Sequence, residues 1–328
     1  MKETDGFPRL SIGSLGGTIS MQATIMGQGV TPQLDCEALL AFLPRLGEIA
    51  QVSTATLGLV PSASMGFAQM IDVLRWAQEE VERGAHGIVI TQGTDSLEES
   101  AYFLDLFWPF DVPLVLTGAM RSAGEPGADG PANLLAAAYV ALARESRDRG
   151  VLVVMNDQIH GAARVRKGDS LSVNAFESPN GGPVGQLFEG QVHYWHMPGH
   201  RTVLPEPDRV QHQVALMESC LDADTGLLDA TLGLGYEGLV IAGFGAGHVS
   251  ERWASSLERI ARQIPVIVAT RTGRGTTASA SYGFVGSEID LQKKGMHMAG
   301  HLCPRKCRIL LWALLGNGLQ SSVRDYLR

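Results

Sequence analysis

Short apolar runs alternate with longer segments of helical periodicity through the first half of the chain, and this alternation restricts its fold more than any other feature. The runs carry too few polar residues for either face to meet water, which is typical of strands in a sheet covered on both sides. The expected strands are Arg9–Ile12, Ala50–Leu57, Gly87–Thr91, Val112–Thr117 and Gly150–Met155. The expected helices are Asp35–Leu43, Ala68–Arg83, Leu97–Phe107 and Ala132–Arg147. Such alternation predicts parallel βαβ units and a doubly wound α/β domain.

A stretch rich in Gly, Pro and Asn then interrupts the pattern, with ESPNGGPVG followed by the hairpin-like LFEGQVHYWH and the polar HRTVLPEPDR. Beyond it the alternation resumes, with strands expected at Gly238–Ile241 and Val266–Ala269 and helices at Glu251–Arg262 and Pro304–Leu315. A chain of 328 residues has the length of about two domains. We therefore expect a larger N-terminal domain over residues 1–200, a linker over 201–212 and a smaller C-terminal α/β domain over 213–328.

Net charge and cysteine content indicate which partners this chain can bind and in which compartment it resides. The chain has 26 Lys and Arg against 34 Asp and Glu, and its net charge of −8 would repel a nucleic acid or an anionic membrane surface. Its four cysteines are too scattered for a disulfide framework, which favours a reducing compartment. The start, MKETDGFPRL, lacks the basic patch and apolar core of a secretory signal. These features predict a cytoplasmic protein with no nucleic-acid or membrane partner.

Loops of small and polar residues follow four of the predicted strands, and three of these loops carry hydroxyl groups. Because ligands bind outside the carboxyl ends of strands in open α/β sheets, these loops are candidate site segments. They are Ser14-Leu15-Gly16-Gly17-Thr18, Pro61-Ser62-Ala63-Ser64, Gln92-Gly93-Thr94-Asp95 and Gly118-Ala119-Met120-Arg121. The alternative is that each supplies only a helix N-cap, since Ser, Thr and Asp are the preferred cap residues.

Two of these loops carry threonines suited to chemistry. The glycine pair before Thr18 allows the backbone to approach a ligand, and Thr94 places a hydroxyl beside the carboxylate of Asp95. A threonine hydroxyl needs a base before it can attack a carbonyl, and a lysine near a carboxylate can supply one. Lys167, which follows the fifth strand, is the candidate base; the alternative is an ordinary solvated surface lysine.

At these residues the chain resembles the bacterial-type L-asparaginase (asparaginase/glutaminase) family. The resemblance rests on four blocks in the family's order across roughly Ser11–Gly185, and CPRKCRILLWALL resembles the family's C-terminal helix. The blocks are GSLGGTIS, VITQGTDSLEESAYFLDL, PLVLTGAMRSAGEPGADGPANLLAA and GVLVVMNDQIHGAARVRKGDSLSVNAFESPNGGPVG.

The resemblance implies hydrolysis of the L-asparagine side-chain amide to L-aspartate and ammonia. It implies that Thr18 is the nucleophile and that Thr94, Asp95 and Lys167 form a second catalytic set. It also implies substrate binding by Ser62 at the α-carboxylate, by Gly93, Thr94 and Asp95, and by the Ala119 carbonyl at the leaving nitrogen. No metal or organic cofactor is implied, and the expected assembly is a homotetramer built as a dimer of dimers, with sites completed across the dimer.

The chain departs from the family pattern at four places. The segment SMQATIMGQGVTPQL lacks the family's lid tyrosine, and Ala63 replaces a frequent carboxamide. In the second domain, Gly245-Ala246-Gly247-His248 replaces a GNGN-like turn, and the loop Thr276–Ser281 carries no acid. His248 is therefore a candidate contact to the neighbouring subunit's substrate; the alternative is a histidine that caps the helix start at Val249–Trp253.

These departures from the family pattern leave other functions open. One is hydrolysis of L-glutamine or another small amide, which Ala63, the missing tyrosine and His248 motivate. Another is a weakly active amino-acid-binding paralogue, against which the intact Thr18, Thr94, Asp95 and Lys167 argue. The family's tRNA-dependent amidotransferase member is disfavoured by the net charge of −8 and by the lack of its extra N-terminal region.

Overall fold

The chain divides into two compact units in a computed structural model that describes residues 6–23, 30–32, 43–199 and 201–327. Unit 1 spans Met1–Val203 and unit 2 spans Leu204–Arg328. The predicted helix Asp35–Leu43 lies outside the described residues, apart from Leu43. Residues 201–213 contain neither helix nor strand.

Unit 1 contains an eight-stranded sheet in the order β12-β11-β8-β7-β6-β5-β1-β4. Five of its strands are parallel, and they confirm the five predicted strands: β1 (Arg9–Ser14), β4 (Gln51–Thr56), β5 (Gly87–Thr91), β6 (Leu114–Thr117) and β7 (Val151–Met155). Three antiparallel strands extend the sheet beyond β7: β8 (Gln158–Gly161), β11 (Gly185–Phe188) and β12 (Gln191–Tyr194). The predicted hairpin is therefore an edge of this sheet, formed by β11 and β12.

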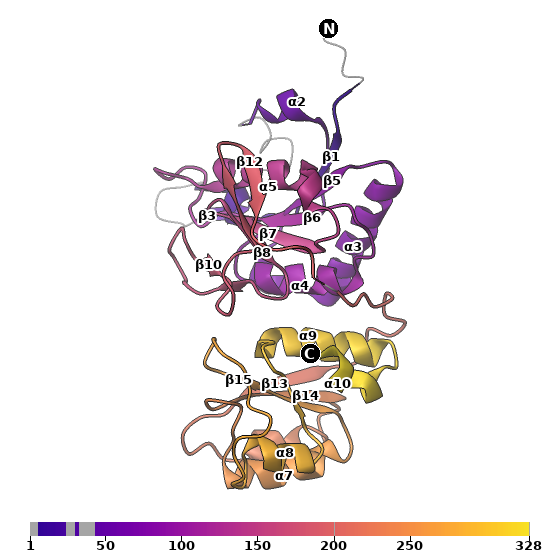
Figure 1. The fold of residues 1–328 in the computed structure, drawn as a ribbon, viewed down its shortest axis with the longest axis vertical. Helices are drawn as coiled ribbons and strands as arrows, with labels where there is room; N and C mark the ends of the chain where they lie inside the picture. Colours follow the sequence, from indigo (N-terminus) through magenta and orange to yellow (C-terminus); the bar gives the residue numbers. More distant parts are fainter. Residues whose placement is uncertain (1–5, 24–29, 33–42, 200, 328) are drawn as a thin grey trace. The chain divides into compact units, whose positions relative to one another are not determined.

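Helices cover both faces of this sheet, as a doubly wound fold requires (Figure 1). The helices α3 (Phe67–Glu82) and α4 (Leu97–Phe107) pack together on one face, and α5 (Gly130–Leu142) packs on the other against β5, β6 and β7. The contact is close because α5 is rich in alanine and β5 begins at Gly87, where a Cβ would overlap the Ala141 backbone.

One predicted helix of unit 1 is shorter than expected. The periodicity predicted a helix to Arg147, but α5 ends at Leu142, Ala143 is extended, and the 3-10 turn η3 (Arg144–Ser146) follows. Ser146 is buried and its hydroxyl bonds the Tyr194 hydroxyl at 2.7 Å, so a tertiary contact ends the helix.

The remaining elements of unit 1 are short. They are η1 (Thr18–Ser20), β2 (Met21–Ala23), β3 (Val30–Pro32), α2 (Leu46–Ile49), η2 (Ser62–Ser64), β9 (Arg166–Lys167) and β10 (Phe176–Glu177).

Unit 2 has its own parallel sheet and its own core. The strands, in spatial order, are β13 (Val214–Glu218), β14 (Gly238–Gly243), β15 (Val266–Thr270) and β16 (His297–Met298). The helix α9 (Pro304–Gly316) packs on β13, β14 and β15, while α7 (Glu251–Ala261) lies on the opposite face (Figure 1). Its shorter helical elements are α6 (Gly226–Ala230), α8 (Glu288–Lys293), η4 (Gln320–Ser322) and α10 (Val323–Tyr326). Among the described parts of both units, no helix has the length and apolar composition to cross a membrane.

Candidate active site

The parallel strands of unit 1 place the predicted loops at a topological switch point. Along the sheet they run β4-β1-β5-β6-β7, so the spatial order reverses at β1, between β4 and β5. Ser14 at the end of β1 is level with Thr91 at the end of β5, and Thr91 is level with Thr117 at the end of β6. The loops that follow these strands therefore emerge at one edge, where doubly wound sheets bind ligands.

Glycines let these loops approach one another backbone to backbone. A Cβ on Gly17 would overlap the backbone nitrogen of Gly93, so the loops after β1 and β5 are in direct contact. A Cβ on Gly93 would lie 2.7 Å from the Ser62 hydroxyl oxygen, and a Cβ on Gly118 would lie 3.2 Å from the Thr94 methyl carbon. The structure thus brings together all four loops that the sequence singled out.

Three of the predicted catalytic side chains meet directly. The Lys167 side-chain nitrogen Nζ lies 3.0 Å from the Thr94 hydroxyl oxygen and 2.8 Å from Asp95 Oδ1. The Lys167 side chain is 14% exposed and that of Asp95 is 68% exposed, so the amine is enclosed while the carboxylate can still receive a ligand. Lys167 reaches this position because β9 pairs with β10 in a two-stranded ribbon beside the main sheet.

A fourth side chain, the carboxylate of Glu98, also contacts this cluster of Lys167, Thr94 and Asp95, and the sequence did not indicate it. Glu98, in the first turn of α4, is buried, and its Oε2 accepts a hydrogen bond of 2.5 Å from the Lys167 backbone N–H. The carboxylate thereby ties β9 to α4 and fixes the point from which the Lys167 side chain extends. In sequence, Glu98 resembles any acid that stabilises a helix N-terminus, so no local signal marked it.

Ser62 lies on the other side of Asp95. Its hydroxyl oxygen accepts a hydrogen bond of 3.2 Å from the Asp95 backbone N–H, and its carbonyl accepts one of 2.8 Å from the Ser96 hydroxyl. Because the Ser62 oxygen acts as an acceptor toward Asp95, its own proton can be donated to a ligand.

The loops that carry Thr18 and Ala119 both pack at the start of α5. Thr18 is half-buried at the beginning of η1, and Ala119 is fully buried after β6. A Cβ on Gly130 would lie 2.8 Å from Ile19 Cγ1 and 3.4 Å from the Ala119 Cβ, so both loops pack on the same helix end.

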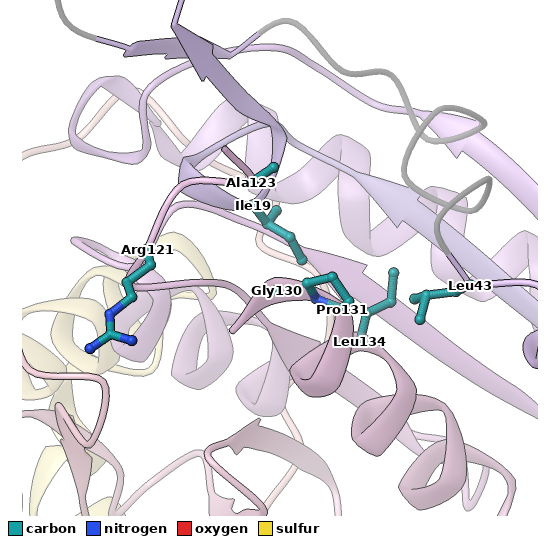
Figure 2. A pocket seen from close by; sticks show the side chains of 7 residues that line it. All are labelled: Ile19, Leu43, Arg121, Ala123, Gly130, Pro131 and Leu134. Atoms are coloured by element: carbon teal, nitrogen blue, oxygen red, sulfur yellow. The ribbon is translucent and has the colours of Figure 1, made fainter. Parts of the chain in front are cut away.

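A separate pocket lies beside this point and is mostly apolar. Figure 2 shows Ile19 next to Gly130 and Pro131, while the Arg121 side chain extends away from them. The lining residues are Ile19, Leu43, Arg121, Ala123, Gly130, Pro131 and Leu134. None of the four predicted catalytic residues lines this pocket, so it is distinct from the polar site at the strand ends.

His248 lies in unit 2, in the tight turn after β14. Its Nε2 lies 3.1 Å from Oε2 of Glu288, and its ring packs edge-on against Tyr282 and Phe284. The alternative that His248 caps the following helix is wrong, because the N-cap of α7 is Ser250, whose hydroxyl accepts from the Trp253 backbone N–H.

Glu288 is the buried acid that holds His248. Burial alone would raise the pKa of the Glu288 carboxyl, but hydrogen bonds from the Tyr282 and Ser281 backbone N–H groups and from His248 hold that pKa below its usual value. The carboxylate is therefore charged and anchors both the turn and the loop before α8. Within the described ranges, no group of three or more His, Cys, Asp or Glu residues is arranged to hold a metal ion.

Comparisons with known proteins match both units to the asparaginase family. The family model described as "Asparaginase, N-terminal" matches residues 9–199, and "Glutaminase/Asparaginase C-terminal domain" matches residues 213–326. The "Probable L-asparaginase periplasmic" of Haemophilus influenzae is 34% identical over 93% of this chain and 87% of its own length. A component of the glutamyl-tRNA(Gln) amidotransferase of Methanosarcina mazei is 31% identical over 94% of this chain and 74% of its own length. The crystal structure of the "Probable Cytoplasmic L-asparaginase from Campylobacter jejuni" superposes with a TM-score of 0.88, at 30% identity, over 98% of this chain and 99% of that chain.

Proposed function

This chain belongs to the asparaginase family, and from that premise we propose that it hydrolyses the side-chain amide of L-asparagine to L-aspartate and ammonia. Family membership makes the protein an amidohydrolase. The observation that carries the proposed chemistry is the contact of the Lys167 amine with both the Thr94 hydroxyl and the Asp95 carboxylate. Thr94 follows Gly93, which touches Gly17, so the loop that carries Thr18 lies beside the cluster of Lys167, Thr94 and Asp95.

Thr18 is the proposed nucleophile in the first step. Its hydroxyl oxygen attacks the amide carbonyl, the C–N bond breaks, and the hydroxyl proton leaves with the nitrogen as ammonia. Backbone N–H groups of the glycine-rich turns can stabilise the oxyanion, which is worth about 3 kcal/mol for each donor. The product of this step is an ester between Thr18 and the β-carboxyl of aspartate.

Thr94 and Lys167 act in the proton transfers that release this ester to water. Lys167 acts as the base and accepts the proton of the Thr94 hydroxyl, while Thr94 in turn takes a proton from the attacking water. As the ester C–O bond breaks, that proton passes from Lys167 to the Thr18 oxygen, which restores both the base and the nucleophile. Asp95 orients Lys167 through the 2.8 Å contact and offers its exposed carboxylate to the substrate α-ammonium. Ser62 donates to the α-carboxylate, which its free proton supports.

A panel of amides tests the function and separates its alternatives. Ammonia release is measured with L-asparagine, L-glutamine, D-asparagine and β-amide analogues, and we expect L-asparagine to give the highest kcat/KM. A preference for glutamine or another small amide is the alternative, which the exposed Ala63 beside Ser62 favours because the side chain offers no hydrogen bond. No release from any of these amides would instead indicate an amino-acid-binding paralogue or an amide-transfer role like that in the name of the Methanosarcina mazei relative.

Two variants test the mechanism. Thr18→Ala and Thr94→Val should each retain less than about a tenth of the wild-type kcat, a barrier increase of more than about 1.4 kcal/mol, with the fold intact by circular dichroism. A folded variant above that limit removes its residue from the chemical step.

The compartment and the assembly are further parts of the proposal. We place the protein in the cytoplasm, which the name of the Campylobacter jejuni structure supports, although the Haemophilus influenzae relative is named periplasmic. We also propose a homotetramer in which His248 contacts the substrate of a neighbouring subunit. Multi-angle light scattering tests the assembly, and a stable monomer with full activity would contradict it.

A further inference from the structure

We propose that Asp129 and Asn133, at the start of α5, are positioning residues that aim the Ala119 carbonyl at the leaving nitrogen of the substrate amide. The inference rests on the proposed function, because it concerns the group that this reaction expels. It starts from an unusual use of a helix end. Asp129 is the N-cap residue of α5, yet its side chain makes no capping bond to that helix.

The Asp129 carboxylate instead turns back to the loop after β6. The Met120 backbone N–H donates to both of its oxygens, at 3.1 and 3.0 Å, and the Arg121 N–H donates to Oδ1 at 2.9 Å. The Met120 N–H and the Ala119 carbonyl belong to one planar trans peptide, so they point in opposite directions. By holding the N–H, Asp129 directs the Ala119 carbonyl away from itself.

Asn133 fixes the peptide on the other side of Ala119. Its Nδ2 donates to the Gly118 carbonyl at 3.0 Å and to Asp129 Oδ2 at 3.0 Å, while its Oδ1 accepts from the Asn156 backbone N–H at 2.9 Å. Because Asn156 directly follows β7, the pair is tied to the sheet as well as to α5. With both flanking peptides held, the carbonyl cannot rotate without breaking several buried hydrogen bonds.

The carbonyl that this arrangement aims is itself left for a ligand. Ala119 is fully buried, and no residue in the described part of the chain donates a hydrogen bond to its carbonyl oxygen. Buried carbonyls are almost always paired, because an unpaired one loses its bond to water without replacement. An N–H of the substrate amide supplies the missing donor.

The leaving group provides a test that a purely structural role would not meet. When L-asparagine reacts, the C–N bond breaks and the leaving nitrogen carries N–H groups that can donate to the Ala119 carbonyl. When the β-methyl ester of L-aspartate reacts, the C–O bond breaks and methanol leaves, and its ester oxygen has no hydrogen to donate. A misdirected carbonyl therefore slows the amide more than the ester, whereas general loss of folded enzyme slows both equally.

The experiment compares kcat/KM for the two substrates in the wild type, Asp129→Asn and Asp105→Asn. In Asp129→Asn an NH₂ that faces only donors replaces one of the two acceptor oxygens, so the bond to either Arg121 or Asn133 is lost and only one oxygen is left to hold the Met120 N–H. Asp105→Asn is the matched control, since this buried carboxylate also accepts a backbone N–H, that of Val151, at the opposite end of β7. We use kcat/KM because it reports the step that expels the leaving group.

We expect Asp129→Asn to lower the amide-to-ester ratio of kcat/KM at least tenfold and Asp105→Asn to change it less than twofold. An equal fall for both substrates in Asp129→Asn overturns the inference and leaves the proposed function standing. A wild type that releases ammonia from none of the amides overturns the proposed function, and this inference with it. If Asp129→Asn does not fold, Asn133→Ser, which loses the bond to the Gly118 carbonyl, is judged by the same ratio.

Discussion

The contact between Gly17 and Gly93 predicts that a single methyl group disrupts the candidate active site. In Gly17→Ala the new Cβ would lie about 1 Å closer to the Gly93 nitrogen than real Cβ atoms lie to any neighbour, and backbone on both sides leaves no flexible atom to move. The loops after β1 and β5 must then separate by about 1 Å, and a displacement of that size near reacting groups lowers kcat by about 100-fold. The left-handed φ of +88° adds about 1–2 kcal/mol of strain to the alanine.

Gly84→Ala separates this strain from the steric overlap. Gly84 also has a left-handed φ, of +91°, but its Cβ would meet only Arg9 Nη1 at 3.6 Å, at the end of α3. Both variants are measured for the free energy of unfolding by urea denaturation and for kcat by ammonia release. We expect similar strain in the two, with loss of kcat confined to Gly17→Ala. A folded Gly17→Ala enzyme with kcat within threefold of the wild type would refute the argument that the two threonine loops must touch.

Three further predictions concern single side chains. Lys167→Met should collapse kcat with a modest change in KM, whereas Asp95→Asn should damage both, because Asp95 is also the proposed α-ammonium ligand; identical kinetic signatures would contradict separate roles. His248→Ala should raise KM several-fold, by about 1–2 kcal/mol, with the oligomer unchanged in size, and co-refolding it with Thr18→Ala should restore activity; a mixed oligomer as inactive as its worse parent excludes action across an interface. His212 is buried, and burial lowers its pKa, so the unfolded chain takes up the proton first and stability should fall as the pH drops below about 6.5. His212→Phe should flatten the dependence of Tm on pH between about 7.5 and 5.5, and a decline parallel to the wild type would show that another group titrates.

The sequence predicts the elements best where local pattern and tertiary packing agree. The strand β5 and the helix α4 begin and end at the predicted residues. Glycine and polar residues bound the fully buried run of β5, and the nearly fully buried α4 ends just before Trp108-Pro109, because the residue before a proline disfavours the helical conformation. The end of α5 was wrong by several residues, since the run after Leu142 contains no helix breaker. What ends the helix is the Ser146–Tyr194 contact, which joins residues 48 positions apart.

The candidate site divides in a similar way. Loops rich in Gly, Ser and Thr after strands are visible in sequence, and the meeting of Thr94, Asp95 and Lys167 agrees with that expectation. Glu98, Asp129 and Asn133 were not identified, because acids and amides in a first helical turn are common and the backbone groups that they hold lie on other loops. Their partners depend on how loops cross in space, which periodicity does not encode.

The contacts of Lys167 with Thr94 and Asp95 also determine when, during folding, the candidate active site becomes complete. The amine meets Asp95 across 72 residues of chain and Thr94 across 73, so the contact closes a long loop whose entropy must be overcome before the contact gives any gain. As the chain leaves the ribosome, the threonine and the aspartate can be in place between β5 and α4 while the lysine has yet to be synthesised. Chemistry at this site therefore begins only after β9 has docked, and the onset of ammonia release during refolding should report the completion of unit 1 rather than the collapse of its core.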